Sequence, residues 1–487
     1  MKISGHIAFL VVLFTSCVFQ FNYATAYTGD VNAARKELDA ARTKKKSVTK
    51  KLEQAKAEGK KSDVIEAIKA DLVAAKDALD SAKANLQAAK AQTPPAATFY
   101  DPEDPPKPSD FCPTPAVPRP KELKSADLEQ YAFEDYIREF GKEYDGEEYK
   151  KREAIFLKAL KDIRRHNDDE RNSHKKGVNF LSDYTDDELQ MIKGLDKPHL
   201  FYTDHVRQQG RGEERVRRNL KTLPDHVDWR DQGIVTPVKN QGWCGSCWAF
   251  ASVETLESQW AIKTGILQEL SEQFVLDCTS TDPCGGLGGG CGGGSASLAY
   301  DRLVEIGGIP SEWTYPYLSA VGDPGECHGL PLPPAKPHSG VVSTAATITG
   351  YRSTTPNSYA DMMYTLATVG PLAVSVDADG WHDYSSGVFD GRNTKQNQTN
   401  PVLDHIVQLV GYGTDEETGQ DYWLVRNSWT TLWGEKGYIR ILREEDAPCG
   451  IDYSPITGGL CADGPSEVEV CGQSGILYGG TWPEVCS

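Results

Sequence analysis

The chain has 487 residues, of which 39% are hydrophobic, so it is long enough for more than one domain with a sizeable core. Its formal net charge at pH 7 is −18, and from Asn219 onward 13 Lys and Arg residues stand against 33 Asp and Glu residues. A domain this acidic repels nucleic acid and anionic membranes, which argues against both as partners.

The first 26 residues (1–26) are typical of a secretory signal peptide. Lys2 is followed by an apolar run over residues 7–19 and by a small-residue cleavage site at residues 24–26. The run is too short to span a bilayer comfortably, and an uncleaved membrane anchor is the alternative. We therefore expect a protein of the secretory pathway, extracellular or in a lysosome or vacuole. Most of its 12 cysteines lie in the C-terminal half, and in such a compartment they indicate disulfides.

Residues 27–92 are expected to form a helical, coiled-coil region. Apolar residues from Ile65 to Ala89 recur at steps of three and four, which is a heptad seam, and Gly59 lies between two such halves. The pattern favours a helical hairpin that could self-associate through residues 31–90, and a solvated, weakly helical spacer is the alternative.

A proline-rich linker is expected over residues 93–122, and it is followed by a charged helical stretch that ends near Asn167. Arg215–Arg218 forms a dibasic-type site in a polar segment, where proteolytic nicking concentrates. From Leu223 the composition changes to Trp, Tyr, Gly and Cys, which marks a domain boundary.

The stretch QGWCGSCWAF contains a candidate nucleophile, Cys247. The residues after it have apolar positions on one helical face, and Gly265 is a plausible stop, so Cys247 should open a helix. A helix N-terminus favours an anion and lowers the pKa of a thiol. Taken alone, Cys244 and Cys247 could also be a redox pair or half of a metal site. The amide of Gln241 could donate to an oxyanion together with the N–H of Cys247.

The histidine partner that such a thiol needs is best supplied by His405. LDHIVQLVGYG, the polar turn TDEETGQ and DYWLVRNSW read as a β-hairpin centred near Glu417. Facing residues then have numbers that sum to about 834, so His405 lies opposite Trp429 with Asn427 on the same face and within reach. The Asn427 amide oxygen could orient the imidazole. A satisfied core histidine is the plainer alternative.

These residues resemble the papain-like cysteine proteases, in particular the cathepsin L-like group, over Leu223 to about Pro455. The resemblance implies an α+β fold in which a papain-like two-domain unit, with a helical left domain and a β-barrel-like right domain, follows an all-α propeptide. It also implies a cysteine endopeptidase that needs no cofactor or metal. In this reading Cys247 is the nucleophile, His405 the general base and acid, Asn427 its orienter, and Gln241 the oxyanion donor.

By the same resemblance, residues 123–218 form an inhibitory propeptide that runs backwards through the cleft. It would be removed by cutting between Arg218 and Leu223, which leaves a peptidase domain over 219–459. A cysteine-containing C-terminal extension over 460–487 follows, either a small disulfide-stapled extension or a flap on the catalytic domain. Ala159 and Leu181 depart from the family's propeptide pattern. The positions that match it are Glu148, Arg152, Phe156, Ile163, Asn167, Gly177, Asn179 and Asp183.

The resemblance further implies disulfides Cys244–Cys291 and Cys278–Cys327. The pairing of Cys112, Cys284, Cys449, Cys461, Cys471 and Cys486 stays open.

Polypeptide substrates, the propeptide itself and cystatin-like inhibitors are the implied partners. The implied substrate lining is mainly apolar, which favours an apolar side chain at P2, two residues before the cut. Because Ile406 is bulky, Val or Leu should suit that pocket better than Phe. Threonine replaces the family's usual glycine at Thr430, and Asn397 is a candidate glycosylation site. The implied substrate-binding residues are Gly293, Gly294, Ser295, Ala296, Ser375, Leu403, Ile406, Trp429 and Ser454.

Two other functions compete with this reading. A thiol–disulfide oxidoreductase would use Cys244 and Cys247 but would leave Gln241, His405 and Asn427 without a role. A binding protein on an inactive scaffold would act through the heptad region, and the intact catalytic set argues against it.

Overall fold

The computed structural model describes residues 62–91, 128, 131–193, 220–279, 289–323, 325–327, 344–392, 400–453 and 467–485, with single positions between 44 and 60. The predicted signal peptide and linker, Asn397 and Ser454 lie outside these ranges, as do Cys112, Cys284, Cys461 and Cys486. The chain divides into two compact units, residues 1–113 and 114–487.

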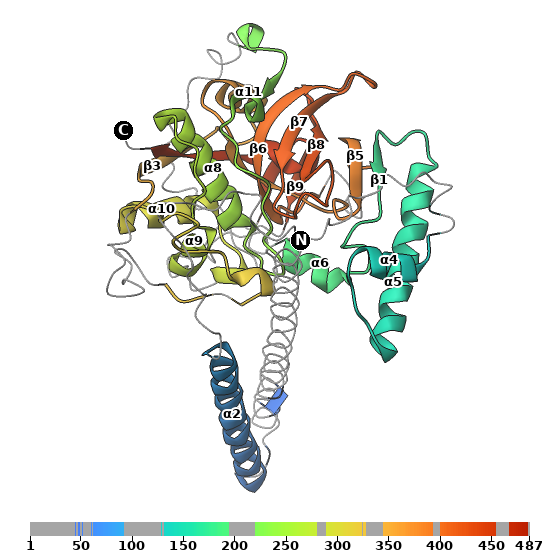
Figure 1. The fold of residues 1–487 in the computed structure, drawn as a ribbon, viewed down its shortest axis with the longest axis vertical. Helices are drawn as coiled ribbons and strands as arrows, with labels where there is room; N and C mark the ends of the chain where they lie inside the picture. Colours follow the sequence, from blue (N-terminus) through green and yellow to red (C-terminus); the bar gives the residue numbers. More distant parts are fainter. Residues whose placement is uncertain are drawn as a thin grey trace, which may run out of the picture. The chain divides into compact units, whose positions relative to one another are not determined.

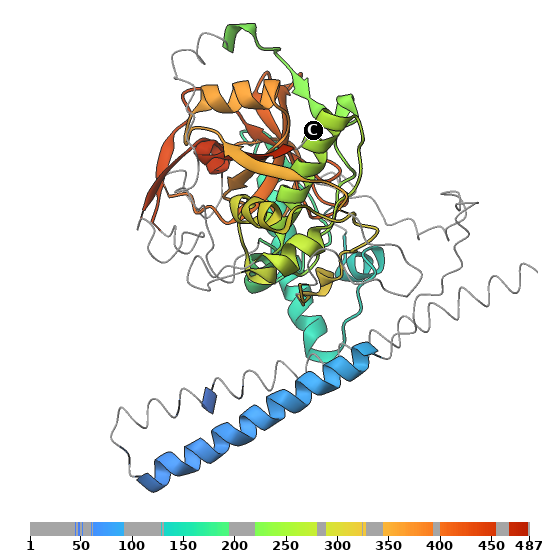
Figure 2. The ribbon, with the colours of Figure 1, turned by 90° about the vertical axis from the view of Figure 1, so that its left-hand side faces the viewer.

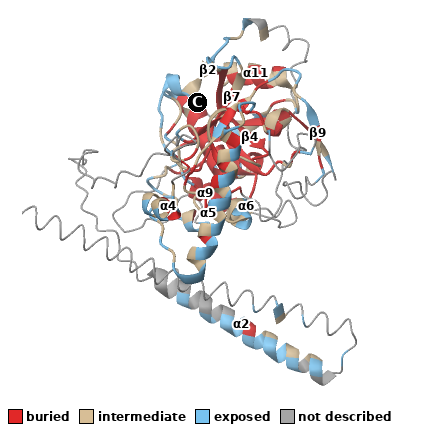
Figure 3. Ribbon diagram, turned by 90° about the vertical axis from the view of Figure 1, so that its right-hand side faces the viewer, coloured by how far each residue is buried: buried red, intermediate tan, exposed pale blue. Residues whose placement is uncertain are grey.

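The first unit contains one long described helix, α2 (Ser62–Ala91), at the position predicted for the second heptad half. Most of its described side chains are exposed, with Ala75 the buried exception (Figure 3). The first half of the predicted hairpin falls almost entirely outside the described residues, so the hairpin itself stays a prediction. None of the helices in the described ranges is long and apolar enough to cross a membrane.

The second unit places a group of helices against a mixed sheet (Figure 1), and Figure 2 shows the same unit turned by 90°. The longer helices of this unit are α4 (Phe133–Glu139), α5 (Gly146–Asn167), α6 (Asp186–Ile192), α8 (Cys247–Thr264), α9 (Glu272–Cys278), α10 (Ala296–Ile306) and α11 (Tyr359–Thr368). The 3-10 turns are η3 (Leu220–Thr222), η4 (Trp229–Gln232), η6 (Gly290–Gly292), η7 (Ser319–Val321) and η8 (Gln473–Tyr478).

The main sheet has the strand order β1-β5-β8-β7-β6-β4-β11-β3, with β2 paired to β6, and a separate hairpin joins β9 and β10. The strands are β1 (His174–Lys176), β2 (Val227–Asp228), β3 (Ile348–Ser353), β4 (Leu372–Val376), β5 (Tyr384–Phe389), β6 (His405–Thr414), β7 (Asp421–Arg426), β8 (Tyr438–Leu442), β9 (Cys449–Asp452), β10 (Val468–Cys471) and β11 (Gly480–Val485).

Two hydrophobic clusters correspond to the two halves of the fold. One fills the sheet side and includes Trp423 and Trp433, and the other lies among α8, α9 and α10 and includes Trp248 and Phe274. Helix α8 lies between them: its residues are buried almost throughout, and its backbone is tied to β6 by Gln408. The mixed two-part fold expected from the sequence is confirmed.

The C-terminal residues are built into this fold. β11 lies between β4 and β3 and forms hydrogen-bonded pairs with both. The described part of the predicted extension, residues 467–485, therefore contributes a strand to the main sheet. The disulfide Cys449–Cys471 joins the paired strands β9 and β10.

The segment predicted to be the propeptide has its own small core between α4 and α5, in which Phe133, Tyr136 and Phe156 are buried. It also contributes β1, which pairs with β5 and so extends the main sheet, whereas only helices were expected in this segment. Asn167, at the end of α5, holds the last residue of this strand. Its side-chain amide donates to the carbonyl of Lys176 and accepts from the N–H of the same residue.

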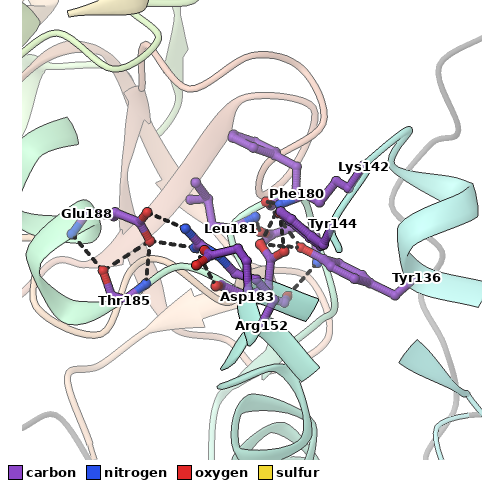
Figure 4. A network of polar contacts seen from close by, with 12 residues as sticks. Tyr136, Lys142, Tyr144, Arg152, Phe180, Leu181, Asp183, Thr185 and Glu188 are labelled. Carbon is purple, nitrogen blue, oxygen red and sulfur yellow. Dashed lines mark hydrogen bonds and ion pairs between the residues drawn. The ribbon is translucent and has the colours of Figure 1, made fainter. Parts of the chain in front are cut away.

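A buried polar network connects α5 to the segment before α6 (Figure 4). The Asp183 carboxylate accepts hydrogen bonds from Tyr136 (3.0 Å) and Tyr144 (2.6 Å) and pairs with Lys142. Arg152 pairs with Glu188 at 2.5 Å, and Glu188 belongs to the capping box that begins α6. The network thereby fixes α6, whose last residues lie on the site described next.

Candidate active site

Cys247 is the first residue of α8, as the sequence predicted, and its thiol is free and 3% exposed. Cys244 is bonded to Cys291, so the two cysteines of QGWCGSCWAF are not partners. The second implied bridge, Cys278–Cys327, is also present. A thiol–disulfide couple between Cys244 and Cys247 has no support in this arrangement.

His405 begins β6 and faces β7 in the register that the sequence predicted. Gln408 pairs with Arg426 and Leu409 with Val425, before a bulge shifts the rest of the hairpin. His405 Nε2 lies 2.8 Å from Asn427 Oδ1, which leaves Nδ1 as the ring nitrogen able to exchange a proton with a thiol.

The indole of Trp429 covers this pair. Its ring stacks on the His405 imidazole with centroids 4.9 Å apart, and Trp429 and Asn427 are both buried. Thr430 adopts a left-handed φ of 63°, so threonine takes up the backbone conformation natural to glycine. Threonine at position 430, where the resemblance implied glycine, leaves the stacking of Trp429 on His405 intact.

Gln241 is fully buried, and its side chain is held at both ends. The Nε2 group donates to the carbonyl of Cys244 (2.9 Å), and Oε1 accepts from Ser428 Oγ (2.5 Å). The sequence analysis missed Ser428, since the two residues are 187 positions apart and only the fold brings them together. Oriented in this way, the amide presents N–H to the space beside Cys247.

Two residues of the predicted propeptide, Ile192 and Lys193, occupy that space. Gln241 Nε2 donates to the Ile192 carbonyl at 2.7 Å, and Trp429 Nε1 lies 3.4 Å from the same oxygen. The Cys247 thiol donates to the Lys193 carbonyl (3.4 Å), and Lys193 Nζ pairs with Asp404 Oδ2 at 3.0 Å. We call these contacts of Ile192 and Lys193 the clamp. Neither clamp residue was predicted, because their contacts with the site are long-range and arise only in the fold.

Burial under the clamp shifts both reactive groups toward their neutral forms. It raises the pKa of the Cys247 thiol to about 12, although backbone N–H groups, including those of the helix start, act in the opposite direction. Burial also lowers the pKa of His405 to about 4. The thiolate expected from the helix N-terminus is therefore not the form held beneath the propeptide, because desolvation outweighs the helix there.

The described members of the implied substrate lining come from several elements of the fold. Ser375 on β4 is directly opposite Ile406 on β6, Ala296 shares the α8 cluster with Ile406, and Ser295 caps α10. Leu403 is buried and lies close to Gly475 of η8.

The two glycines of this lining have local reasons to be glycine. Gly293 has a φ of 104°, in the region where side chains are strained. At Gly294 a Cβ atom would lie 2.5 Å from the Trp248 ring. Both positions therefore require a residue without a side chain, whatever the substrate.

Comparison with known proteins gives a consistent result. The family model described as papain family cysteine protease matches residues 223–458, and the cathepsin propeptide inhibitor domain matches residues 133–189. Fruit bromelain of Ananas comosus is 35% identical over 348 residues, which is 69% of this chain and 88% of bromelain. A cathepsin L-like protein of Caenorhabditis elegans is 35% identical over 66% of this chain and 88% of its own length.

Solved structures agree in fold. The recombinant stem bromelain precursor has a TM-score of 0.54 at 32% identity, covering 73% of this chain and 98% of its own. Digestive procathepsin L2 from the larval midgut of Tenebrio molitor has a TM-score of 0.56 at 31% identity, covering 72% of this chain and 98% of its own.

Proposed function

The chain belongs to the papain family of cysteine proteases and carries its inhibitory propeptide domain, and from this premise we propose that it is an endopeptidase that works through Cys247 and His405. The observation that carries this proposal is the position of the clamp. A peptide carbonyl lies on the Gln241 amide and another lies at the Cys247 thiol, 2.7 and 3.4 Å away. An amide N–H and a thiol that lie against peptide carbonyls of the propeptide can also reach the carbonyl of a bound peptide substrate.

The proposed reaction has two halves. Cys247, having passed its proton to His405, attacks the peptide carbonyl, and Gln241 with the Cys247 N–H stabilises the resulting oxyanion. His405 then protonates the leaving amine as the C–N bond breaks, which leaves an acyl thioester. Water, deprotonated by His405, hydrolyses the thioester and restores the thiol. Asn427 keeps the imidazole oriented throughout, and Ser428 does the same for Gln241.

The test is activation of the purified zymogen at acidic pH, followed by assay and N-terminal sequencing. We expect peptide hydrolysis by the wild type, none by Cys247→Ala, and a mature chain that begins between Arg218 and Leu223. Hydrolysis by Cys247→Ala would overturn the mechanism. A mature N-terminus upstream of Asp204 would overturn the proposed boundary between propeptide and peptidase.

For the residue two before the cut, we propose an apolar preference, with Val or Leu favoured over Phe. The support is that Ile406 is buried, with 9% of its surface exposed, and that it pairs across the strands with Ser375. Neither of these two side chains carries a charge. Fluorogenic peptides that differ only at this position provide the assay. Fastest turnover with Arg there would refute the preference.

The remaining proposals concern the location of the enzyme, its inhibitors, its glycosylation and its self-association. We propose passage through the secretory pathway to the cell exterior or to a lysosome or vacuole, inhibition by cystatin-like proteins, glycosylation at Asn397, and self-association through residues 31–90. Support for the last is α2, a 30-residue helix at the predicted place. Sedimentation of the chain with and without residues 27–92 tests it.

A further inference from the structure

Ser474 contacts a buried ring near the active site from a part of the chain that the family model does not reach. It belongs to η8, the turn that leads into β11, and lies beyond the matched residues 223–458. Its side chain is 8% exposed and accepts a hydrogen bond from the indole N–H of Trp381 at 3.3 Å. Trp381 is completely buried. A buried indole needs a partner for its single donor, and the Ser474 hydroxyl supplies one.

Trp381 is in contact with the imidazole of His405. The two rings meet edge to face, with centroids 6.2 Å apart and planes at 88°. Trp381 also stacks on Trp433 at 6.2 Å, and Trp433 meets Trp429 edge to face at 5.2 Å. The Trp433 indole N–H donates to the carbonyl of Trp381 at 2.9 Å. Trp381 and Trp429 therefore both contact the imidazole, and Trp433 connects them.

The backbone of Ser474 holds a second group near His405. Its carbonyl accepts a hydrogen bond from the N–H of Asp377 at 2.8 Å. Asp377 directly follows Val376, the last residue of β4, which pairs with His405 across the sheet. Ser474 makes both contacts from a left-handed backbone with a φ of 56°. Residues other than glycine that are held in this region cluster at functional sites.

We propose that Ser474 is a positioning residue for His405, because it holds the Trp381 indole against the imidazole that serves Cys247. This inference rests on the endopeptidase function proposed above and adds a residue to the same site. All the residues involved follow Leu223, so they stay in the chain after the proposed activation. Without the hydroxyl, the buried indole N–H loses its acceptor, and a ring that turns to find another one changes its contact with His405.

The experiment compares the activated wild type with Ser474→Ala on an internally quenched peptide that has Leu two residues before the cut. Active-site titration gives the concentration of each enzyme. We expect kcat of Ser474→Ala to fall roughly three- to tenfold, as for a small misplacement of a reacting group, with KM changed less than about twofold. The loss falls on kcat because the indole acts on the imidazole and not on the binding of the peptide.

The pH profile gives a readout that a loss of stability alone would not move. Burial lowers the pKa of His405, so an indole that moves away and admits water should raise it. The alkaline limb of kcat/KM reports loss of the imidazolium proton and should move up by roughly 0.5 pH unit in Ser474→Ala. Asp404 also raises this pKa and is kept in every variant, whereas Lys193 lowers it and leaves with the propeptide.

Further variants separate this role from folding. Ser474→Gly removes the hydroxyl but suits the left-handed backbone, so it should fold and still lose kcat as Ser474→Ala does. In a Trp381→Phe background, which has no indole N–H, Ser474→Ala should cause no further loss of kcat. Ser353→Ala is the matched control. It removes a serine hydrogen bond of 3.1 Å to Thr481, between β3 and β11, and should keep the wild-type kcat.

The outcomes distinguish this inference from the proposed function. If Ser474→Ala yields no folded zymogen, Ser474→Gly is measured in its place. A wild-type kcat and pH profile in the variant that is measured would overturn the inference and leave the endopeptidase intact. The same loss of kcat with and without the Trp381 indole would overturn it as well. Absence of cleavage by the wild type would overturn the proposed function instead.

Discussion

Thr430 shows how a single residue near the active site can carry strain. Its φ of 63° costs a β-branched residue roughly 1–2 kcal/mol. Glycine would relieve this strain but would also lose the hydrogen bond from the Leu432 N–H to Thr430 Oγ1, 2.9 Å long. That bond is worth about 1 kcal/mol, so the two effects nearly cancel. Asparagine tolerates the left-handed region and keeps an acceptor, which makes it the informative substitution.

Thr430→Asn is expected to stabilise the zymogen by about 0.5–1 kcal/mol, because it removes strain without removing the acceptor. Urea unfolding of the Cys247→Ala zymogen, which cannot process itself, measures the change. Thr431→Asn is the control, since Thr431 is exposed and has no positive φ, and it should have little effect. Equal effects at the two positions would show that Thr430 is not strained.

Among single residues, the sequence predicted those that are placed by a nearby helix start or by the register of one hairpin. Cys247 followed from a helix start, and Asn427 followed from His405 through the hairpin register. Lys193 and Asp404 are 211 positions apart, and no periodicity connects them. Their pairing depends on how the propeptide docks, which is a property of the fold.

At the scale of elements, one buried ion pair joins the nucleophile helix to the strand that leads to Asn427. Arg426 at the end of β7 lies 3.1 Å from Glu254 in α8, and their side chains are 0% and 1% exposed. Burial raises the pKa of Glu254 to about 7, against the effect of Arg426. The contact between α8 and β7 therefore depends on whether the Glu254 carboxyl is protonated.

Arg426→Met should destabilise the Cys247→Ala zymogen by about 3–5 kcal/mol at pH 7.5, because it leaves a buried carboxylate without its partner. The loss should be smaller at pH 5, where Glu254 is protonated. The double variant Glu254→Gln/Arg426→Met should recover part of the loss. Lys150→Met, which breaks the exposed pair with Glu147, should change stability by less than about 0.5 kcal/mol. A double variant no more stable than Arg426→Met would contradict the pairing.

β11 leads to a second prediction at this scale. A chain that ends at Gly479 should fail to yield folded zymogen, because β3 and β4 would both lose their shared neighbour. A chain that ends at Val485 should fold. Soluble yield and near-ultraviolet circular dichroism distinguish the two. Recovery of folded, activatable zymogen from the chain ending at Gly479 would show that β11 is not needed for the sheet to form.

At the scale of the whole molecule, acid should weaken the hold of the propeptide. His166 is buried at the end of α5, and its ring lies 4.4 Å from that of His174. Burial, with the charges of His174 and Lys176, lowers the pKa of His166 to about 4, and Asp383 and the backbone carbonyl of His174 oppose the shift only in part. The unfolded propeptide binds this proton near pH 6.5. Stability from neutral His166 is therefore complete above pH 6.5 and is lost as pH falls toward 4.

His166→Gln keeps a donor for the His174 carbonyl but cannot titrate. In the Cys247→Ala background, we expect its melting temperature to fall less than that of the parent between pH 7 and pH 4.5. Asp169 also faces His166 and should be left unchanged in these variants. His226→Gln, at an exposed histidine, is the control and should follow the parent. Parallel pH profiles for His166→Gln and its parent would rule out this contribution.

Activation of this zymogen depends on a thiol that the propeptide covers and that becomes exposed when the propeptide is removed. The most direct test labels the protein at pH 6 with a thiol-selective epoxide, before and after activation, and maps the label by mass spectrometry. We expect one equivalent of label on Cys247 after activation and little before, because the zymogen keeps this thiol protonated and blocked by Lys193. Equal labelling of the zymogen, or a label that persists in Cys247→Ala, would contradict this expectation.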